Sequence, residues 1–177
     1  ILVTKNREAS EIVNYWRTFG VNAAELKLGN FFATTSAADL YLILSAIADL
    51  ANRHNFMRAL SSQVFNLELT FLATNTQENN PQLEFWYKQF FAYKGIWERK
   101  GIFSLIYVLL EDVVSRHAAA QATLSNRELA NLWQLAELLN KQASKLHNQS
   151  ELLYWFKQKI SKAETQLGGD LEGNNEE

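Results

Sequence analysis

The sequence of 177 residues contains no cysteine. Disulfide bonds, zinc sites built on thiolates and catalysis by a thiol are therefore excluded. The sequence also lacks an apolar run of the roughly 18–20 residues that a bilayer-spanning helix needs, and no signal peptide precedes its first residues. These absences favour an intracellular protein that does not enter a membrane.

Neither sign of charge dominates the chain. Its 17 lysines and arginines and 19 aspartates and glutamates give a formal net charge of −2, and the sequence pI is about 6.0. The strongly basic balance of a free-standing nucleic-acid-binding module is therefore missing. The 47% hydrophobic and 20% charged residues are typical of a globular chain with a buried core, and the length predicts one domain or a domain and a half.

Motifs that would carry catalysis are also missing. The sequence contains neither the phosphate loop GxxxxGK(S/T) nor the nucleophile elbow GxSxG. Its histidines, His54, His117 and His147, are far apart, so surface or capping roles are favoured over metal binding. The adjacent carboxylates at 111–112 and 176–177 do not share a helix face, which favours a solvated surface over a catalytic pair. We therefore expect no catalytic residue, metal site or cofactor in the isolated chain.

Most of the chain shows the three-and-four spacing of apolar residues that is typical of amphipathic helices. Residues 52–55 are expected to break the helix over 36–51, and Gly101 is expected to turn the chain after the long helix that starts at Pro81. The predicted helices are 36–51 with Ser36 as its cap, two short pieces within 56–75, Pro81 to about Lys100, and Leu152 to about Ala163 with Asn148 or Ser150 as its cap.

The first residues predict a different local structure. Residues 1–3 and 21–28 are predicted strands on either side of a helix over 7–19, which would form a βα(β) element. Such an element needs neighbouring strands, and the sequence begins at Ile1 without an initiator methionine. We therefore expect a fragment of a longer protein.

The central residues 94–139 predict two apolar helices joined by a polar loop. Ser125 and Glu128 have the S-x-x-E spacing of a capping box, which satisfies unpaired backbone N–H groups at a helix start. The residues predicted to pack between the helices are Ile102, Phe103, Ile106, Leu109, Leu110 and Val113 from the first, and Leu129, Leu132, Trp133, Ala136 and Leu139 from the second. Burial of each large side chain contributes on the order of 1.5–3 kcal/mol, so we expect this pair to form the core of a helical domain.

Two groups of side chains suggest binding surfaces. An aromatic series over 85–97 resembles a base-stacking platform. Such a platform needs basic residues between its aromatic ones, and Lys88 and Lys94 are the only lysines between them, so core packing is favoured. The alternative is an all-helical interaction module with an aromatic partner groove between Trp86 and Trp97. The one locally basic region is either a solvated helix face or a DNA-binding surface that contacts phosphates. It comprises Lys141, Lys145, Lys157, Lys159 and Lys162.

Several positions follow a known family pattern. In the centre and the last helix they are Trp97, Gly101, Ile102, Asn126, Arg127, Leu129, Leu132, Leu135, Ala136, Glu137, Leu138, Leu139 and Trp155. This pattern resembles RecB, the beta subunit of the bacterial exodeoxyribonuclease V helicase–nuclease. The opening ILVTKNREASEIVNYWRTFGV is similar to motif IV of superfamily 1 helicases of the UvrD/Rep type, and residues 29–50 resemble the segment that follows that motif. The order and spacing favour RecB over the related AddA nuclease–helicases.

The resemblance implies a mainly α fold with three parts. Residues 1–35 would be part of the second RecA-like domain, 36–165 a helical domain like the inserted domain 2B, and 166–177 an acidic, glycine-rich linker. The parent enzyme would use ATP and Mg²⁺ to unwind and degrade DNA in double-strand-break repair and recombination. It would act in the bacterial cytoplasm with RecC-like and RecD-like subunits, and the isolated fragment would be inactive.

Three positions depart from the family pattern. Thr4 stands where the family carries an arginine that reaches the nucleotide phosphates, although Lys5 and Arg7 lie close by and can supply the charge. The resemblance thus implies a nucleotide-phosphate region at these three residues. Ala38 replaces a family glutamate, with Asp39 next to it, and Asn66 stands where the family shows a glycine-containing turn near the duplex.

Overall fold

The chain is a helical assembly in the computed structural model, which describes residues 31–67, 80–120 and 124–172. These residues contain α2 (Thr35–Ala48), α3 (Arg53–Leu60), α5 (Pro81–Lys100), α6 (Ile102–Ala120), α7 (Asn126–Ala143) and α8 (Gln149–Glu172). No strand occurs among them, and none of these helices is both long and apolar enough to cross a bilayer. The mainly α fold is confirmed, whereas the predicted strands and helix within residues 1–28 lie outside the described part.

Helix α2 begins earlier than the sequence predicted. The hydroxyl oxygen of Thr34 accepts a hydrogen bond from the backbone N–H of Ala37 at 3.2 Å, and Thr34 itself is extended (φ −93°, ψ 152°). A cap residue needs this extended backbone. Ser36, the predicted cap, instead lies buried inside the first turn, so that prediction was wrong by two positions.

Residues 52–55 start helix α3, whereas α2 already ends at Ala48 and not near residue 51 as predicted. The side chain of Asn52 accepts a hydrogen bond from the N–H of Asn55 at 3.1 Å and caps α3. After α3, a carboxylate oxygen of Asp39 accepts the N–H of Gln63 at 3.0 Å, which ties this segment back to α2. Asn66 then adopts a positive φ of 50°, a conformation that asparagine tolerates better than most residues. A turn therefore lies where the family shows a glycine-containing one.

The long helix α5 has the predicted start and end. The side chain of Asn80 accepts hydrogen bonds from the N–H groups of Gln82 (2.8 Å) and Leu83 (3.4 Å), and Pro81 occupies the first helical position. Gly101 ends the helix with φ 86° and ψ 173°, a region that is essentially restricted to glycine. Because α6 begins at the next residue, this single glycine sets the angle between the two helices.

The last two helices also begin at predicted caps. The Ser125 hydroxyl accepts the N–H of Glu128 at 3.2 Å, and the Glu128 carboxylate accepts the N–H of Ser125 at 2.7 Å, which is the expected capping box. Asn148 caps α8 by accepting the N–H of Glu151 at 2.8 Å. Helix α8, however, continues to Glu172 instead of ending near Ala163. No proline follows in the sequence to stop it, and each glycine costs only about 1 kcal/mol in a helix.

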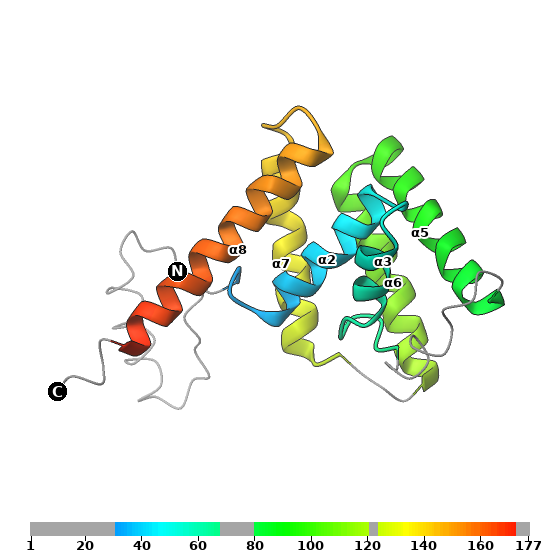
Figure 1. Ribbon diagram of the computed structural model, residues 1–177, viewed down its shortest axis with the longest axis horizontal. Coiled ribbons are helices and arrows are strands. Elements are labelled where there is room, and N and C mark those ends of the chain that lie inside the picture. The colour runs from blue at the N-terminus through cyan, green and yellow to red at the C-terminus, as the bar shows by residue number, and fades with distance from the viewer. Residues whose placement is uncertain (1–30, 68–79, 121–123, 173–177) are drawn as a thin grey trace, which may run out of the picture.

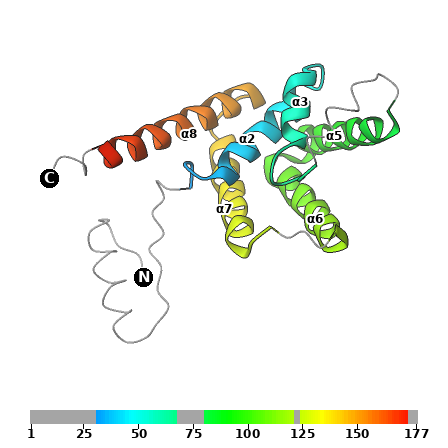
Figure 2. The same cartoon turned by 60° about the horizontal axis from the view of Figure 1, so that its bottom comes forward.

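Helix α2 is the central element of the assembly. It contacts α3, α5, α7 and α8, while α5, α6 and α7 each contact the next helix in chain order (Figure 1). The face of α2 that meets them is fully buried at Leu40, Ile43, Leu44 and Ile47. The C-terminal part of α8 extends beyond the other helices, as Figure 2 shows from a second direction.

The predicted interface between α6 and α7 is largely correct. All the residues predicted from α6 are buried except Phe103, which is 38% exposed. Leu105 takes its place in the core. On α7, Leu135 joins the buried set, whereas Leu129 and Trp133 are only half-buried.

Candidate functional site

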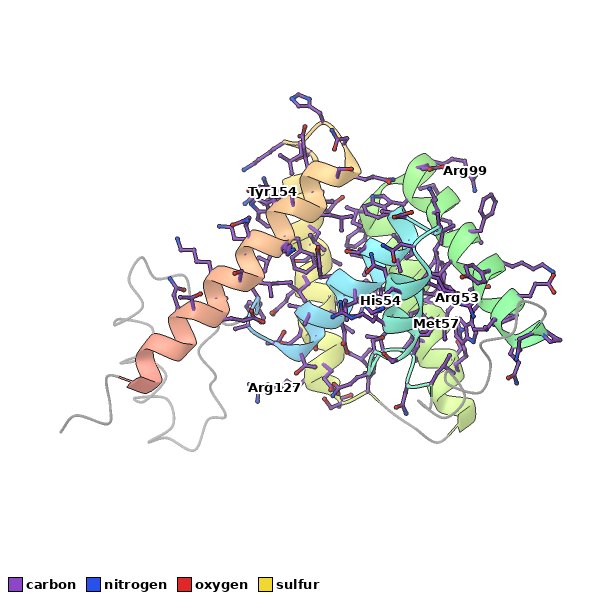
Figure 3. All side chains as sticks on the ribbon, viewed as in Figure 1. Arg53, His54, Met57, Arg99, Arg127 and Tyr154 are labelled. Carbon is purple, nitrogen blue, oxygen red and sulfur yellow. The ribbon has the colours of Figure 1, made fainter. Side chains whose placement is uncertain are left out.

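An aromatic cluster fixes α8 to α2. The fully buried ring of Phe156 meets Phe32 and Tyr41 edge-on, with ring centroids 6.1 and 6.0 Å apart. Phe32 also packs edge-on against Trp155 at 5.8 Å. Such edge-to-face pairs stabilise packing beyond the area that they bury. Tyr154, in contrast, is 67% exposed and points away from the cluster (Figure 3).

A cleft of about 560 Å³ opens beside this cluster, between α2, α3 and α8. Its volume is in the range of about 300–1,000 Å³ that is typical of small-molecule sites. The polar and charged side chains that line it include Tyr41 and Ser45 from α2, Asn55 and Arg58 from α3, and Lys157 and Glu164 from α8.

The cleft contains polar groups without partners. Arg58 and Lys157 are exposed, and neither side chain forms an ion pair or a hydrogen bond with another described residue. The hydroxyl of Ser45 is buried and likewise has no hydrogen-bond partner among the described residues. Glu164 adds one carboxylate. Two unpaired cations against one carboxylate leave a net positive charge, so this arrangement can hold an anion.

The lysines predicted to bind DNA do not share one surface. Lys141 lies in the last turn of α7 and Lys145 in the turn that follows, whereas Lys157, Lys159 and Lys162 lie on α8, and all five are exposed. Residues 157 and 159 are roughly 200° apart around the helix. Accordingly, only Lys157 lines the cleft, and the ammonium of Lys159 lies 5.7 Å from the ring centroid of Trp155.

The predicted nucleotide-phosphate region lies outside the described residues, because Thr4, Lys5 and Arg7 all precede residue 31. Of the histidines, His54 on α3 and His147 before α8 are exposed. Within the described residues, no three histidine or acidic side chains gather as they would around a metal ion.

Four side chains of the aromatic series on α5 belong to the core, whereas Phe85 and Phe91 are 53% and 71% exposed. Trp86 and Trp97 are only 7% and 5% exposed, and Phe90 and Tyr93 are buried as well. Core packing is therefore confirmed for these four side chains. A partner groove around the two tryptophans is contradicted, because such a groove needs them exposed.

A polar network between α5 and α6 had no signal in the sequence. The Tyr93 hydroxyl donates a hydrogen bond to the Asp112 carboxylate at 2.7 Å, and the Gln89 amide donates to the same oxygen at 2.8 Å. The Arg116 guanidinium donates to the Tyr93 oxygen at 3.1 Å and lies over the ring of Trp86 at 4.5 Å. These contacts join the two helices, so we assign the network a structural role.

This network makes stability depend on pH at the alkaline end. Burial raises the pKa of Tyr93 from 10.0 to about 12. A raised pKa means that the fold favours the neutral hydroxyl, so its stabilising contribution is complete below pH 10 and is lost as the pH rises to 12. We expect the free energy of unfolding to fall by on the order of 2 kcal/mol over this interval. Urea unfolding at a series of pH values measures this, and a Tyr93→Phe variant with an equally steep decline would contradict it.

Arg58 and the cleft were not predicted from the sequence. The walls of the cleft come from residues 38–58 and 157–164, which are far apart in the chain. Only Lys157 had a signal, as one member of a locally basic stretch. No short motif links Arg58 to α8, so only the packing of both α3 and α8 on α2 brings the two cations into one cleft.

Comparison with known proteins gives two relatives, although no model of a protein family matches the chain. The chain is 28% identical over 162 residues to the RecBCD enzyme subunit RecB of Haemophilus influenzae, which covers 90% of this chain and 13% of the relative. It is 24% identical over 162 residues to the subunit of the same name from Buchnera aphidicola, covering 91% of this chain and 14% of the relative. The chain therefore spans only a small part of either relative. These matches confirm the resemblance found in the sequence, because over nearly its whole length the chain is similar to one segment of the RecB subunit.

Proposed function

We propose that the chain is a segment of a RecB-like subunit of an ATP-dependent DNA helicase and exonuclease that acts in double-strand-break repair and recombination. The observation that carries this proposal is the similarity to RecB subunits of two bacteria over 90% and 91% of the chain. The helical structure of the described residues supports it, because the resemblance implies a helical insertion over 36–165.

The segment would support the enzyme without catalytic motifs of its own. Residues 1–35 would contribute part of a motor lobe, with Thr4, Lys5 and Arg7 near the nucleotide phosphates, and the helical residues 36–165 would lie near the DNA. ATP and Mg²⁺ would bind chiefly to other parts of the parent protein, since this sequence lacks the phosphate loop. RecC-like and RecD-like subunits would be its partners, in the bacterial cytoplasm.

The exposed lysines would contribute to DNA contact. Because they occupy different sides of α8 and the end of α7, we propose that they attract the DNA backbone over a broad surface. Such contacts weaken steeply with salt and are insensitive to base sequence. The proposed lysines are Lys141, Lys145, Lys157, Lys159 and Lys162.

Exchange of the segment tests the proposal. The matched 162 residues of the Haemophilus influenzae relative would be replaced by those of this chain, and the hybrid subunit assembled into its enzyme. We expect the hybrid enzyme to unwind duplex DNA in an ATP-dependent reaction. A hybrid that folds and assembles but does not unwind DNA would contradict the proposal.

A further inference from the structure

We propose that the cleft between α2, α3 and α8 binds one nucleotide of single-stranded DNA, with the phosphate held by Arg58 and Lys157. The choice of DNA as the polymer rests on the proposed function. The site itself rests on the geometry and charge of the cleft.

The phosphate part of the site is built from two helices. Arg58 lines the cleft from α3 and Lys157 from α8, and both side chains lack a charge partner among the described residues. A guanidinium binds a phosphate through two parallel hydrogen bonds, and an ammonium adds a compact positive charge. With the carboxylate of Glu164 in the same cleft, the two cations leave a net charge of +1, which matches the single negative charge of a phosphodiester.

The rest of the cleft suits the sugar and base. A volume of about 560 Å³ is larger than a bare oxyanion needs and is in the range of sites that enclose a small organic molecule. Leu42, Ile160 and the ring of Tyr41 supply apolar and aromatic surface, on which bases readily pack.

Glu164 sets a limit on how tightly the cleft binds an anion. Its carboxylate lines the same cleft and repels a phosphate. A Glu164→Gln substitution keeps the shape of the side chain and removes the repulsion. We therefore expect this variant to bind DNA more tightly than the unaltered chain, whereas a lysine surface without a defined site would not distinguish this carboxylate from others.

Binding of a fluorescein-labelled oligothymidylate of about 12 nucleotides, followed by fluorescence anisotropy over a series of salt concentrations, tests the site. For the double variant Arg58→Ala/Lys157→Ala we expect a loss of affinity of roughly tenfold or more. Loss of this one phosphate contact should also make the slope of log affinity against log salt shallower by about 0.7. Thymidine monophosphate serves as a competitor, and a chain that binds it but not the oligonucleotide would overturn the proposal.

A control variant removes the same charge elsewhere. Arg99 on α5 and Arg127 at the start of α7 lie away from the cleft, so Arg99→Ala/Arg127→Ala should leave affinity nearly unchanged (Figure 3). Equal losses in the two double variants, or none in the first, would overturn the site. Thermal melting of each variant checks that it folds. Failure of the unaltered chain to bind the oligonucleotide would also overturn it, while unwinding by the hybrid enzyme judges the proposed function separately.

Discussion

Substitution of Phe156 by alanine is expected to lower the free energy of unfolding by about 3–5 kcal/mol. The ring is fully buried and contacts both Phe32 and Tyr41. Its removal leaves a cavity between α8 and α2 as well as the lost burial of the ring. Urea unfolding followed by circular dichroism measures the loss.

The neighbouring Tyr154 provides the matched control. It lies on the same helix but is 67% exposed, so Tyr154→Ala should change stability by less than about 0.5 kcal/mol. Equal effects of the two substitutions would mean that α8 does not dock on α2 through Phe156. The cleft would then lose one wall, because Lys157 and Glu164 belong to α8.

Substitution of Asp112 by alanine is expected to lower the free energy of unfolding by about 2–3 kcal/mol. The carboxylate accepts hydrogen bonds from the Tyr93 hydroxyl and the Gln89 amide, and the Arg116 guanidinium lies 3.7 Å from it. Without it, buried donors lose their acceptor, at about 1–3 kcal/mol for each one left unsatisfied. Because the Asp112 side chain is 34% exposed, water can hydrogen-bond to some of the freed donors. The expected loss is therefore smaller than the sum for all the donors.

The Glu111→Ala variant is the control for Asp112→Ala, because it removes a neighbouring carboxylate that lies outside the network. It accepts a hydrogen bond only from the exposed Tyr107 hydroxyl, at 2.6 Å, among the described residues. Glu111→Ala removes the same charge as Asp112→Ala but should cost less than about 0.5 kcal/mol. If urea unfolding gave the two variants similar stabilities, the network between α5 and α6 would not be a significant source of stability.

The features that were predicted from the sequence are those set by neighbouring residues. The capping box at Ser125 and Glu128, the Asn80–Pro81 start and the Gly101 turn each depend on a few consecutive positions, and all were found. The start of α2 was misplaced because Thr34 and Ser36 are both chemically able to cap a helix. Only the backbone path after Phe31, where the Thr34 hydroxyl donates to the Phe31 carbonyl at 2.7 Å, selects between them.

Features that depend on tertiary packing were not predicted. The burial of Leu105 instead of Phe103 depends on how α6 is rotated against its neighbours, and a pattern of apolar residues does not fix that angle closely. The Tyr93 network and the cleft need helices that are distant in sequence. Lys157 was singled out only for its charge, and which face of α8 meets α2 decides that Lys157, and not Lys159, lines the cleft.

Whether this chain is a working segment of a RecB-like subunit is tested most directly by the rate of ATP-dependent unwinding by the enzyme that carries the exchanged segment. We predict unwinding by this hybrid, and loss of unwinding when the same segment also carries the destabilising Phe156→Ala substitution. Tyr154→Ala in the same position should leave the rate unchanged. A stable, assembled hybrid with no unwinding activity would contradict the claim that this chain is a working segment of a RecB-like subunit.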